Sequence, residues 1–170
     1  SSAGALRGKK GSIYEGGHRV PALAWWPGQI PAGTVNKQMA ITLDLMPTLL
    51  ELSGAKLPEN HSLDGISLVP YFSQVSNEER ELYWRNGGLG SKSKTLVAAD
   101  SSKAMRDGKW KLVAQANYRQ LELYNLDTDI NESVNLSSKY PERVQRMLSK
   151  LKEWEQEMSV SLPYQVKASL

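Results

Sequence analysis

The sequence predicts an α+β fold in which a small antiparallel sheet packs against a C-terminal helix. Apolar residues recur at a helical spacing over residues 42–52, and a second helical spacing follows Pro141. Between them, several short apolar runs surround one tight-turn dipeptide. A helix, then a run of strands, then a last helix is the order of an α+β layer, so we expect the last helix to cover one face of the sheet.

Length and composition fit a globular domain and exclude several other classes of protein. The chain has 170 residues, about one domain, and can bury roughly 70% of its unfolded surface. Without cysteine it has no disulfide, thiolate metal site or cysteine nucleophile, and two histidines leave little material for a zinc or copper site. Its 21 basic and 18 acidic residues are too evenly mixed for a nucleic-acid surface. Apolar stretches of about five residues are too short to span a bilayer.

The first part of the chain is predicted to be a loop followed by a strand. Residues 1–17 contain five glycines, which is typical of a loop. Residues 20–26 are typical of a short buried strand that ends at the turn signal Pro27-Gly28. The two tryptophans of this strand, Trp25 and Trp26, are expected to pack in a core rather than to stack on a sugar.

The next element is a helix over residues 42–52. Thr42 or Asp44 can cap its first turn, where Pro47 does no harm, and Gly54 is well placed to end it. Residues 56–80 are rich in turn formers, and we predict only one turn there, at Asp64-Gly65.

The strands follow, and three or four of them can form an antiparallel sheet. Asp107-Gly108 is the dipeptide that type I′ hairpin turns favour, because both central residues of that turn need a positive φ. The predicted strands cover residues 83–84, 95–99, 103–106, 109–113 and 120–126.

The C-terminal helix begins at Pro141, which suits the first helical position. Its apolar residues, three and four positions apart, mark one face that we expect to pack on the sheet. They are Val144, Met147, Leu148, Leu151, Trp154 and Met158.

The N-terminal loop is the candidate functional segment. Arg7, Lys9 and Lys10 fall within four positions and alternate with glycines, a combination that a backbone-and-side-chain cradle for an anion needs. On chemistry alone, a solvated basic loop explains the same residues, and this alternative stays open.

The run from Leu6 to Pro21 closely resembles the second signature of the type I sulfatases, the arylsulfatase family of the alkaline-phosphatase superfamily. The resemblance continues in order as far as about Met158. The other matching segments are Asp44 to Leu49 (D-hydrophobic-P-T), Leu63 to Leu68, Met105 to Leu112 (R-x-G-x-W-K), Leu123 to Leu126, and Asn131-Glu132 with Asn135-Leu136.

This resemblance implies the C-terminal part of a sulfatase-like α/β fold, with a four-stranded antiparallel sheet packed against the C-terminal helix. Residues 1–80 are then expected to be the end of the large α/β domain, and residues 81–170 the sheet-and-helix subdomain. In the family, the lysine before Gly-Ser or Gly-Thr of this signature contacts the sulfate ester, so Lys10 becomes the expected catalytic and substrate-binding residue. Gly16, Gly17 and Arg19 are expected to support the loop.

The sequence also departs from the family. The formylglycine nucleophile is made from Cys or Ser in a [CS]-x-P-x-R signature, which this sequence does not contain. We therefore expect the formylglycine and the ligands of the family's calcium to lie in a missing N-terminal portion, and no metal ligand in this chain. Alone, the chain should be inactive.

The resemblance further implies a substrate that is a sulfate ester of a sugar or aryl compound. It also implies an extracytoplasmic location, whether periplasmic, secreted or lysosomal. Two alternatives remain at this point. One is a phosphonate or phosphate monoester hydrolase of the same superfamily, and the other is a non-catalytic module that binds anions or glycans.

Overall fold

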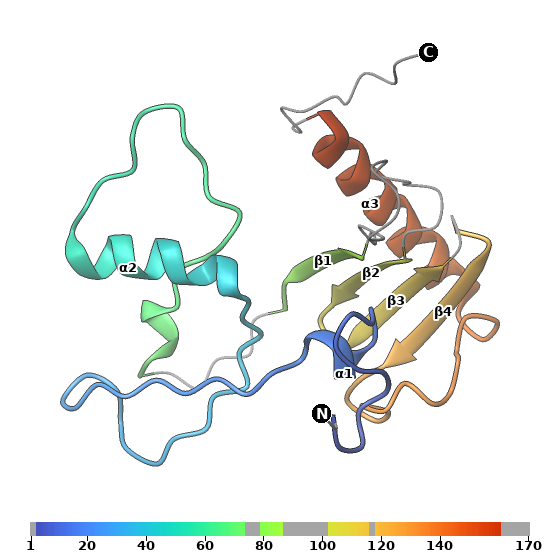
Figure 1. The fold of residues 1–170 in the computed structure, drawn as a ribbon, viewed down its shortest axis with the longest axis horizontal. Coiled ribbons are helices and arrows are strands. Elements are labelled where there is room, and N and C mark those ends of the chain that lie inside the picture. The colour runs from blue at the N-terminus through green and yellow to red at the C-terminus, as the bar shows by residue number, and fades with distance from the viewer. Residues whose placement is uncertain (1–2, 74–78, 87–101, 116–117, 161–170) are drawn as a thin grey trace. The chain divides into compact units, whose positions relative to one another are not determined.

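The computed structural model describes residues 3–73, 79–86, 102–115 and 118–160 (Figure 1). The chain divides into two compact units, one made of Ser1–Val20 with Arg80–Leu170 and the other of Pro21–Glu79. The N-terminal loop therefore belongs to the same unit as the sheet. The assignment of residues 1–80 to the large domain of a longer enzyme, and of 81–170 to its C-terminal subdomain, stays a prediction.

The first unit contains the predicted four-stranded antiparallel sheet, in the simple order β1-β2-β3-β4. Each strand pairs with the next along the chain; for example, Met105 lies opposite both Tyr83 and Leu112. The strands are β1 (Glu81–Asn86), β2 (Ser102–Asp107), β3 (Trp110–Gln115) and β4 (Gln120–Asn125). The predicted strand at 95–99 lies outside the described residues.

The sequence predicts a hairpin between β2 and β3 with Asp107-Gly108 as its central residues, and the structure has this hairpin one residue further along the chain and with a different turn type. Asp107 pairs with Trp110, which leaves Gly108 and Lys109 as the two central residues. Gly108 has a φ of 55°, whereas Lys109 does not have a positive φ. A positive φ at the first central residue alone is typical of a type II′ turn, which needs glycine only there, so the type I′ prediction was wrong.

The predicted C-terminal helix is α3 (Pro141–Val160), and it covers one face of the sheet. Met147 and Leu151 are fully buried there against Leu112 and Leu123. Met158 is 38% exposed, so the predicted apolar face is not buried to its end. The reason is that Trp154 already stacks on Tyr83 of the edge strand β1, at a ring-centroid distance of 5.3 Å, and no further described strand lies beyond β1.

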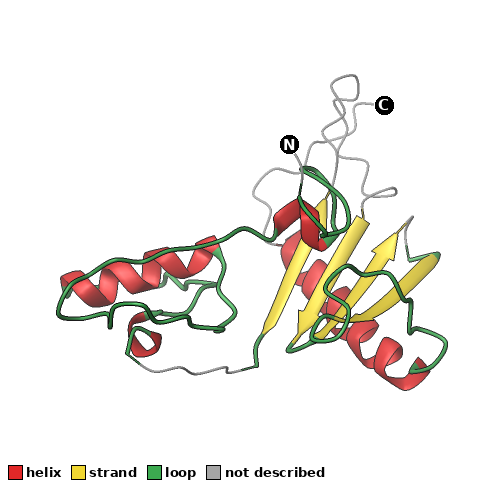
Figure 2. Cartoon of the chain, turned by 90° about the horizontal axis from the view of Figure 1, so that it is seen from below, coloured by secondary structure: helices red, strands yellow, loops and turns green. Residues whose placement is uncertain are grey.

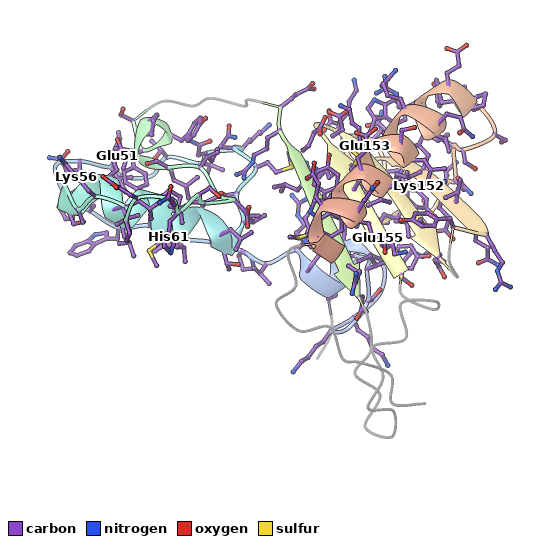
Figure 3. The ribbon with its side chains drawn as sticks, turned by 90° about the horizontal axis from the view of Figure 1, so that it is seen from above. Glu51, Lys56, His61, Lys152, Glu153 and Glu155 are labelled. Carbon is purple, nitrogen blue, oxygen red and sulfur yellow. The ribbon has the colours of Figure 1, made fainter. Side chains whose placement is uncertain are left out.

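An ion pair also joins α3 to the sheet. Lys103 of β2 is almost fully buried, and its Nζ lies 2.7 Å from Oε1 of Glu155 on α3 (Figure 3). The Tyr118 hydroxyl donates a hydrogen bond to the other oxygen of that carboxylate. None of the helices that the structure describes is long and apolar enough to cross a membrane.

The N-terminal segment covers the opposite face of the sheet (Figure 2). Ile13 is buried there against Ala104, Val113 and Tyr124, just before the short helix α1 (Glu15–His18). The sheet is therefore the middle layer between α3 and the segment that carries Lys10.

The second unit is built around the predicted helix, here α2 (Leu45–Ser53), which ends at Gly54 with a left-handed φ of 68° as expected. Two short 3₁₀ helices accompany it, η1 (Thr42–Asp44) and η2 (Val69–Tyr71). Gly65, in the predicted turn, lies so close to η1 that an added Cβ would be 2.2 Å from the Leu43 carbonyl oxygen.

Asp44 and Thr48 form hydrogen bonds with the chain segment that follows this turn. The fully buried Asp44 carboxylate accepts hydrogen bonds from the N–H groups of Ile41, at 2.8 Å, and Ile66, at 3.0 Å. The Thr48 hydroxyl accepts one from Leu68 N–H at 2.8 Å and donates to the Asp44 carbonyl. The D-hydrophobic-P-T segment thus holds residues 66–68 against α2.

We expect Asp44→Ala to destabilise the second unit by about 2–3 kcal/mol, because it leaves two part-buried N–H groups without their charged acceptor. Urea unfolding followed by tryptophan fluorescence measures the loss. Asp64→Ala, at an exposed position in the same unit, is the control and should change the midpoint little. Equal midpoints for the two variants would contradict the structural role of Asp44.

The predicted buried strand at residues 20–26 is not present. This segment forms neither helix nor strand, and Leu23 and Trp25 are 91% and 82% exposed. Trp26, expected in a core, is 42% exposed and makes only an edge contact to Phe72 among the ring contacts that the structure describes. The physical reason is that a strand needs a neighbour for its backbone N–H and C=O groups, and every described strand belongs to the other unit.

Candidate functional site

Lys10 lies at the tip of a tight turn formed by Lys9 to Ser12. The Ser12 N–H donates a hydrogen bond to the Lys9 carbonyl at 2.8 Å, so Lys10 and Gly11 are the two central residues. Gly11 has a φ of 87°, which is typical of the third position of a type II turn and explains the glycine there. The Lys10 side chain is exposed, so its ammonium is available to a ligand.

The loop that carries this turn closes on itself, and glycines allow the close approach. Gly16 N–H donates to the Arg7 carbonyl at 2.8 Å. A Cβ added at Gly16 would lie 2.5 Å from that same oxygen, and one added at Gly17 would lie 1.9 Å from the Ser12 carbonyl oxygen. The expectation that Gly16 and Gly17 support the loop agrees with these contacts.

Gly17→Ala should therefore lower stability by about 1–3 kcal/mol, because the added methyl overlaps backbone that must then move. It should also displace the Lys10 turn, which ends at Ser12. The matched control is Gly11→Asn, since nothing lies within 4 Å of its added Cβ and Asn tolerates a positive φ. Thermal unfolding of the two variants gives the comparison, and a Gly17→Ala variant no less stable than Gly11→Asn would refute the argument.

A buried ion cluster fastens the loop to the sheet. Lys111 of β3 is fully buried, and its Nζ lies 2.8 Å from Oε1 of Glu15 and 2.8 Å from Oε1 of Glu132. The other Glu132 oxygen accepts the backbone N–H of Glu15 at 2.7 Å. Glu132 holds a φ of 53°, an uncommon value for a residue with a side chain, at the position where its carboxylate enters the cluster.

Two further side chains contact the Glu15 carboxylate. Arg19 Nη1 lies 3.1 Å from Oε2, and His18 Nε2 lies 3.4 Å from Oε1 while its ring stacks on Trp84 at 4.5 Å. Burial acts to raise the pKa of Glu15, but the hydrogen bonds from His18, Lys111 and Arg19 and the charge of Lys111 outweigh it, so the pKa is lowered well below its ordinary value. Arg19 thus supports the loop, as the sequence predicts.

The lowered pKa makes stability depend on pH. A carboxyl group whose pKa is lower in the folded than in the unfolded protein stabilises the folded state. The contribution is complete at a pH above the unfolded pKa, 4.5 for Glu15, and it is lost as the pH falls toward the folded pKa. We expect Glu15→Gln to be less stable than the wild type at pH 7, with a difference that shrinks below about pH 4.5. Urea midpoints between pH 3 and pH 7 test this, and a constant difference would contradict it.

A second network ties the start of the loop to β4. The Arg7 guanidinium donates hydrogen bonds to the Tyr124 hydroxyl, at 2.7 Å, and to the Glu132 carbonyl, at 2.9 Å. It also lies 3.8 Å from the centre of the Tyr14 ring. The Tyr14 hydroxyl donates to Glu122 at 2.7 Å, and burial together with this carboxylate raises the pKa of Tyr14 to about 12. Arg7, though in the basic run, is therefore a structural anchor.

Asn86, at the end of β1, reaches the turn itself, because its side-chain amide donates a hydrogen bond to the Gly11 carbonyl. Lys10 is thus at the tip of a turn that is fixed at its base by the ion cluster and beside its tip by the sheet. Chemically, the arrangement offers an anion an exposed ammonium on a fixed backbone turn.

The cofactors that the sulfatase resemblance implies do not fit the side chains present. Among the described residues, no three or more His, Cys, Asp or Glu side chains gather where they could hold a metal ion. The cluster carboxylates of Glu15 and Glu132 are instead occupied by Lys111.

Comparison with known proteins places this arrangement in a family. The family described as N-sulphoglucosamine sulphohydrolase, C-terminal, matches residues 8–159, from the Lys10 turn to the end of α3. The chain belongs to this sulfatase family. The resemblance of the sequence to the C-terminal portion of sulfatases is confirmed, together with the antiparallel sheet and terminal helix that it implied.

Individual sulfatases show the same similarity. A sulfatase of Formosa agariphila is 33% identical over 160 residues, which cover 88% of this chain and 29% of that protein. Arylsulfatase A of Bos taurus is 54% identical over 101 residues, 59% of this chain and 20% of that protein. A crystal structure of Ps i-CgsB in complex with k-i-k-neocarrahexaose matches with a TM-score of 0.75 and 32% identity, over 88% of this chain and 31% of that one. The chain thus spans less than a third of the length of each of these three proteins.

Sequence reasoning found Lys10 and its supporting residues but missed the ion cluster. Lys111 and Glu132 lie within matching sulfatase segments, yet nothing in those segments shows that their side chains meet. One signal was available, because Lys111 is the one charged residue in the otherwise apolar run from Trp110 to Ala114. The role of Lys10 itself stays a prediction.

Proposed function

We propose that this chain is the C-terminal part of a longer sulfatase that cleaves sulfate esters of sugars or aryl compounds, and that Lys10 binds the sulfate group. The observation that carries the proposal is the exposed ammonium of Lys10 at the tip of a turn that is fixed on both sides. Membership of the sulfatase family supports the reaction. Its relatives include arylsulfatases and N-acetylgalactosamine-6-sulfatases, which supports the two substrate classes.

The role of Lys10 is electrostatic. An ammonium about 4 Å from a sulfate oxygen gains roughly 4 kcal/mol at an effective dielectric constant near 20. The interaction becomes stronger if negative charge grows on the leaving oxygen in the transition state, so it assists the reaction as well as binding. Because the turn is already fixed, little of this interaction energy is lost in ordering the backbone that carries the Lys10 side chain.

In this proposal, the formylglycine nucleophile and the calcium ion with its ligands belong to the rest of the longer protein. Because the 170-residue chain lacks these groups, it is inactive alone. A location outside the cytoplasm, in the periplasm, the lysosome or the medium, is part of the same proposal. The exposed apolar residues of the second unit, such as Leu23 and Trp25, fit a surface that another part of the protein covers.

The experiment that tests the function compares aryl sulfate and aryl phosphate as substrates of the full-length protein. We expect faster turnover of the sulfate ester. Dominant turnover of the phosphate, or of an aryl phosphonate, would replace the proposed reaction by the phosphonate or phosphate monoester hydrolase alternative. Tight binding of a sulfated oligosaccharide without turnover would favour a non-catalytic binding module.

A further inference from the structure

A second basic site lies at the opposite side of the sheet from Lys10. Where the chain enters α3, six residues line a pocket of about 370 Å³, a size within the range of ligand sites. They are Lys139, Tyr140, Pro141, Glu142, Arg143 and Arg146. Trp110, beside this pocket, packs against the core on the face of the sheet that α3 covers. The segment that carries Lys10 covers the opposite face of the sheet. This pocket is therefore separate from the candidate site.

Two aromatic rings and two cations form a continuous row at this pocket. The Tyr140 and Trp110 rings meet edge to face at a centroid distance of 5.1 Å. The Arg143 guanidinium lies 4.6 Å from the centre of the Trp110 ring, and Lys139 Nζ lies 5.5 Å from that of Tyr140. These cation–π contacts hold two of the charges in place without neutralising them.

The pocket also has an excess of positive charge, for which the described residues provide no ion pair. Lys139, Arg143 and Arg146 make no ion pair within the part of the chain that the structure describes, although the carboxylate of Glu142 lines the same pocket. Elsewhere in this unit, cations such as Lys103, Lys111 and Arg19 have carboxylate partners. Uncompensated cations beside a pocket attract an anionic ligand.

We propose that this pocket binds a sulfated polysaccharide chain outside the catalytic centre. Guanidinium groups bind tetrahedral oxyanions with paired hydrogen bonds, and the amphipathic rings of Tyr140 and Trp110 offer apolar surface for a sugar ring. The combination fits an anionic sugar polymer better than a nucleic acid, which calls for a longer basic stripe. The sulfated nature of the ligand rests on the proposed function, whereas the binding of an anion in this basic pocket does not.

The test measures binding of dextran sulfate to the full-length protein by affinity electrophoresis at fixed salt. Arg146→Ser should weaken binding by about fivefold through loss of one exposed cation, and Glu142→Gln should tighten it by about twofold because a repelling carboxylate is removed. Lys152→Ser, at an exposed position further along α3, is the control for net charge and should change little (Figure 3). All three variants are expected to hydrolyse a small aryl sulfate at the wild-type rate.

The two pocket variants should change the affinity for dextran sulfate in opposite directions, and this separates an effect on binding from an effect on the structure. Equal affinities of Arg146→Ser and Lys152→Ser, or no tightening by Glu142→Gln, would overturn the proposal. So would equally tight, equally Arg146-dependent binding of single-stranded DNA, which would assign the pocket to another class of polymer. A protein that binds dextran sulfate in this pattern but does not hydrolyse aryl sulfate would keep the pocket and refute only the proposed function.

Discussion

Replacing Lys10 with alanine in the full-length enzyme is expected to lower kcat/KM for a sulfate ester by roughly 30-fold to 1,000-fold, equivalent to about 2–4 kcal/mol. The exposed ammonium lies at the tip of a type II turn, where it can approach a sulfate oxygen. Because the charge on that oxygen grows in the transition state, kcat should fall as well as affinity. Steady-state kinetics with an aryl sulfate measure both quantities.

The matched control for this prediction is Lys152→Ala, which removes the same charge from the helix on the opposite face of the sheet. It should leave kcat/KM unchanged. Lys10→Ala should also leave the unfolding midpoint unchanged, because the Lys10 side chain is exposed and the turn is held by backbone hydrogen bonds. Activity of Lys10→Ala within about twofold of the wild type would remove Lys10 from the site.

Lys111→Met is expected to destabilise the protein by about 3–5 kcal/mol, because it leaves the buried carboxylates of Glu15 and Glu132 without their shared cation. Methionine nearly matches the length of lysine, so the loss reports on charge rather than on a cavity. The unfolding midpoint in urea measures it. Activity should fall too, since Glu15 begins the helix that follows the Lys10 turn.

The control for this variant is Lys109→Met, two residues earlier on the exposed hairpin turn, which should cost little. Adding Glu132→Gln to Lys111→Met should restore part of the lost stability, because it removes one of the two carboxylate charges that Lys111 had paired. A Lys111→Met protein as stable as Lys109→Met would show that the cluster is not the anchor of the loop.

Much of the fold could be predicted from local patterns. The helical spacing of Leu43, Met46 and Leu49, with Gly54 after it, identified α2, and Pro141 with its apolar series identified α3. Asp107-Gly108 placed the central hairpin of the sheet. These features depend on residues a few positions apart, so a single sequence contains the information that determines them.

Predictions that needed a neighbouring chain segment failed or were missed. The apolar run at 20–26 suggested a buried strand, but a strand forms only where another strand pairs with it, and the described residues of the second unit offer none. The turn type at Gly108 and Lys109 likewise depends on how the paired strands twist, which the dipeptide alone does not specify.

The sequence by itself determined the order of the elements, the sulfatase resemblance and the lysine at position 10. Only the tertiary structure decided what holds that lysine in place. Lys111 and Glu15 are 96 positions apart, and Glu15 and Glu132 are 117 apart, so no local spacing predicts that their charges meet beneath the loop. Burying these charges is favourable only when all three groups come together, and the packing of the loop on the sheet achieves this.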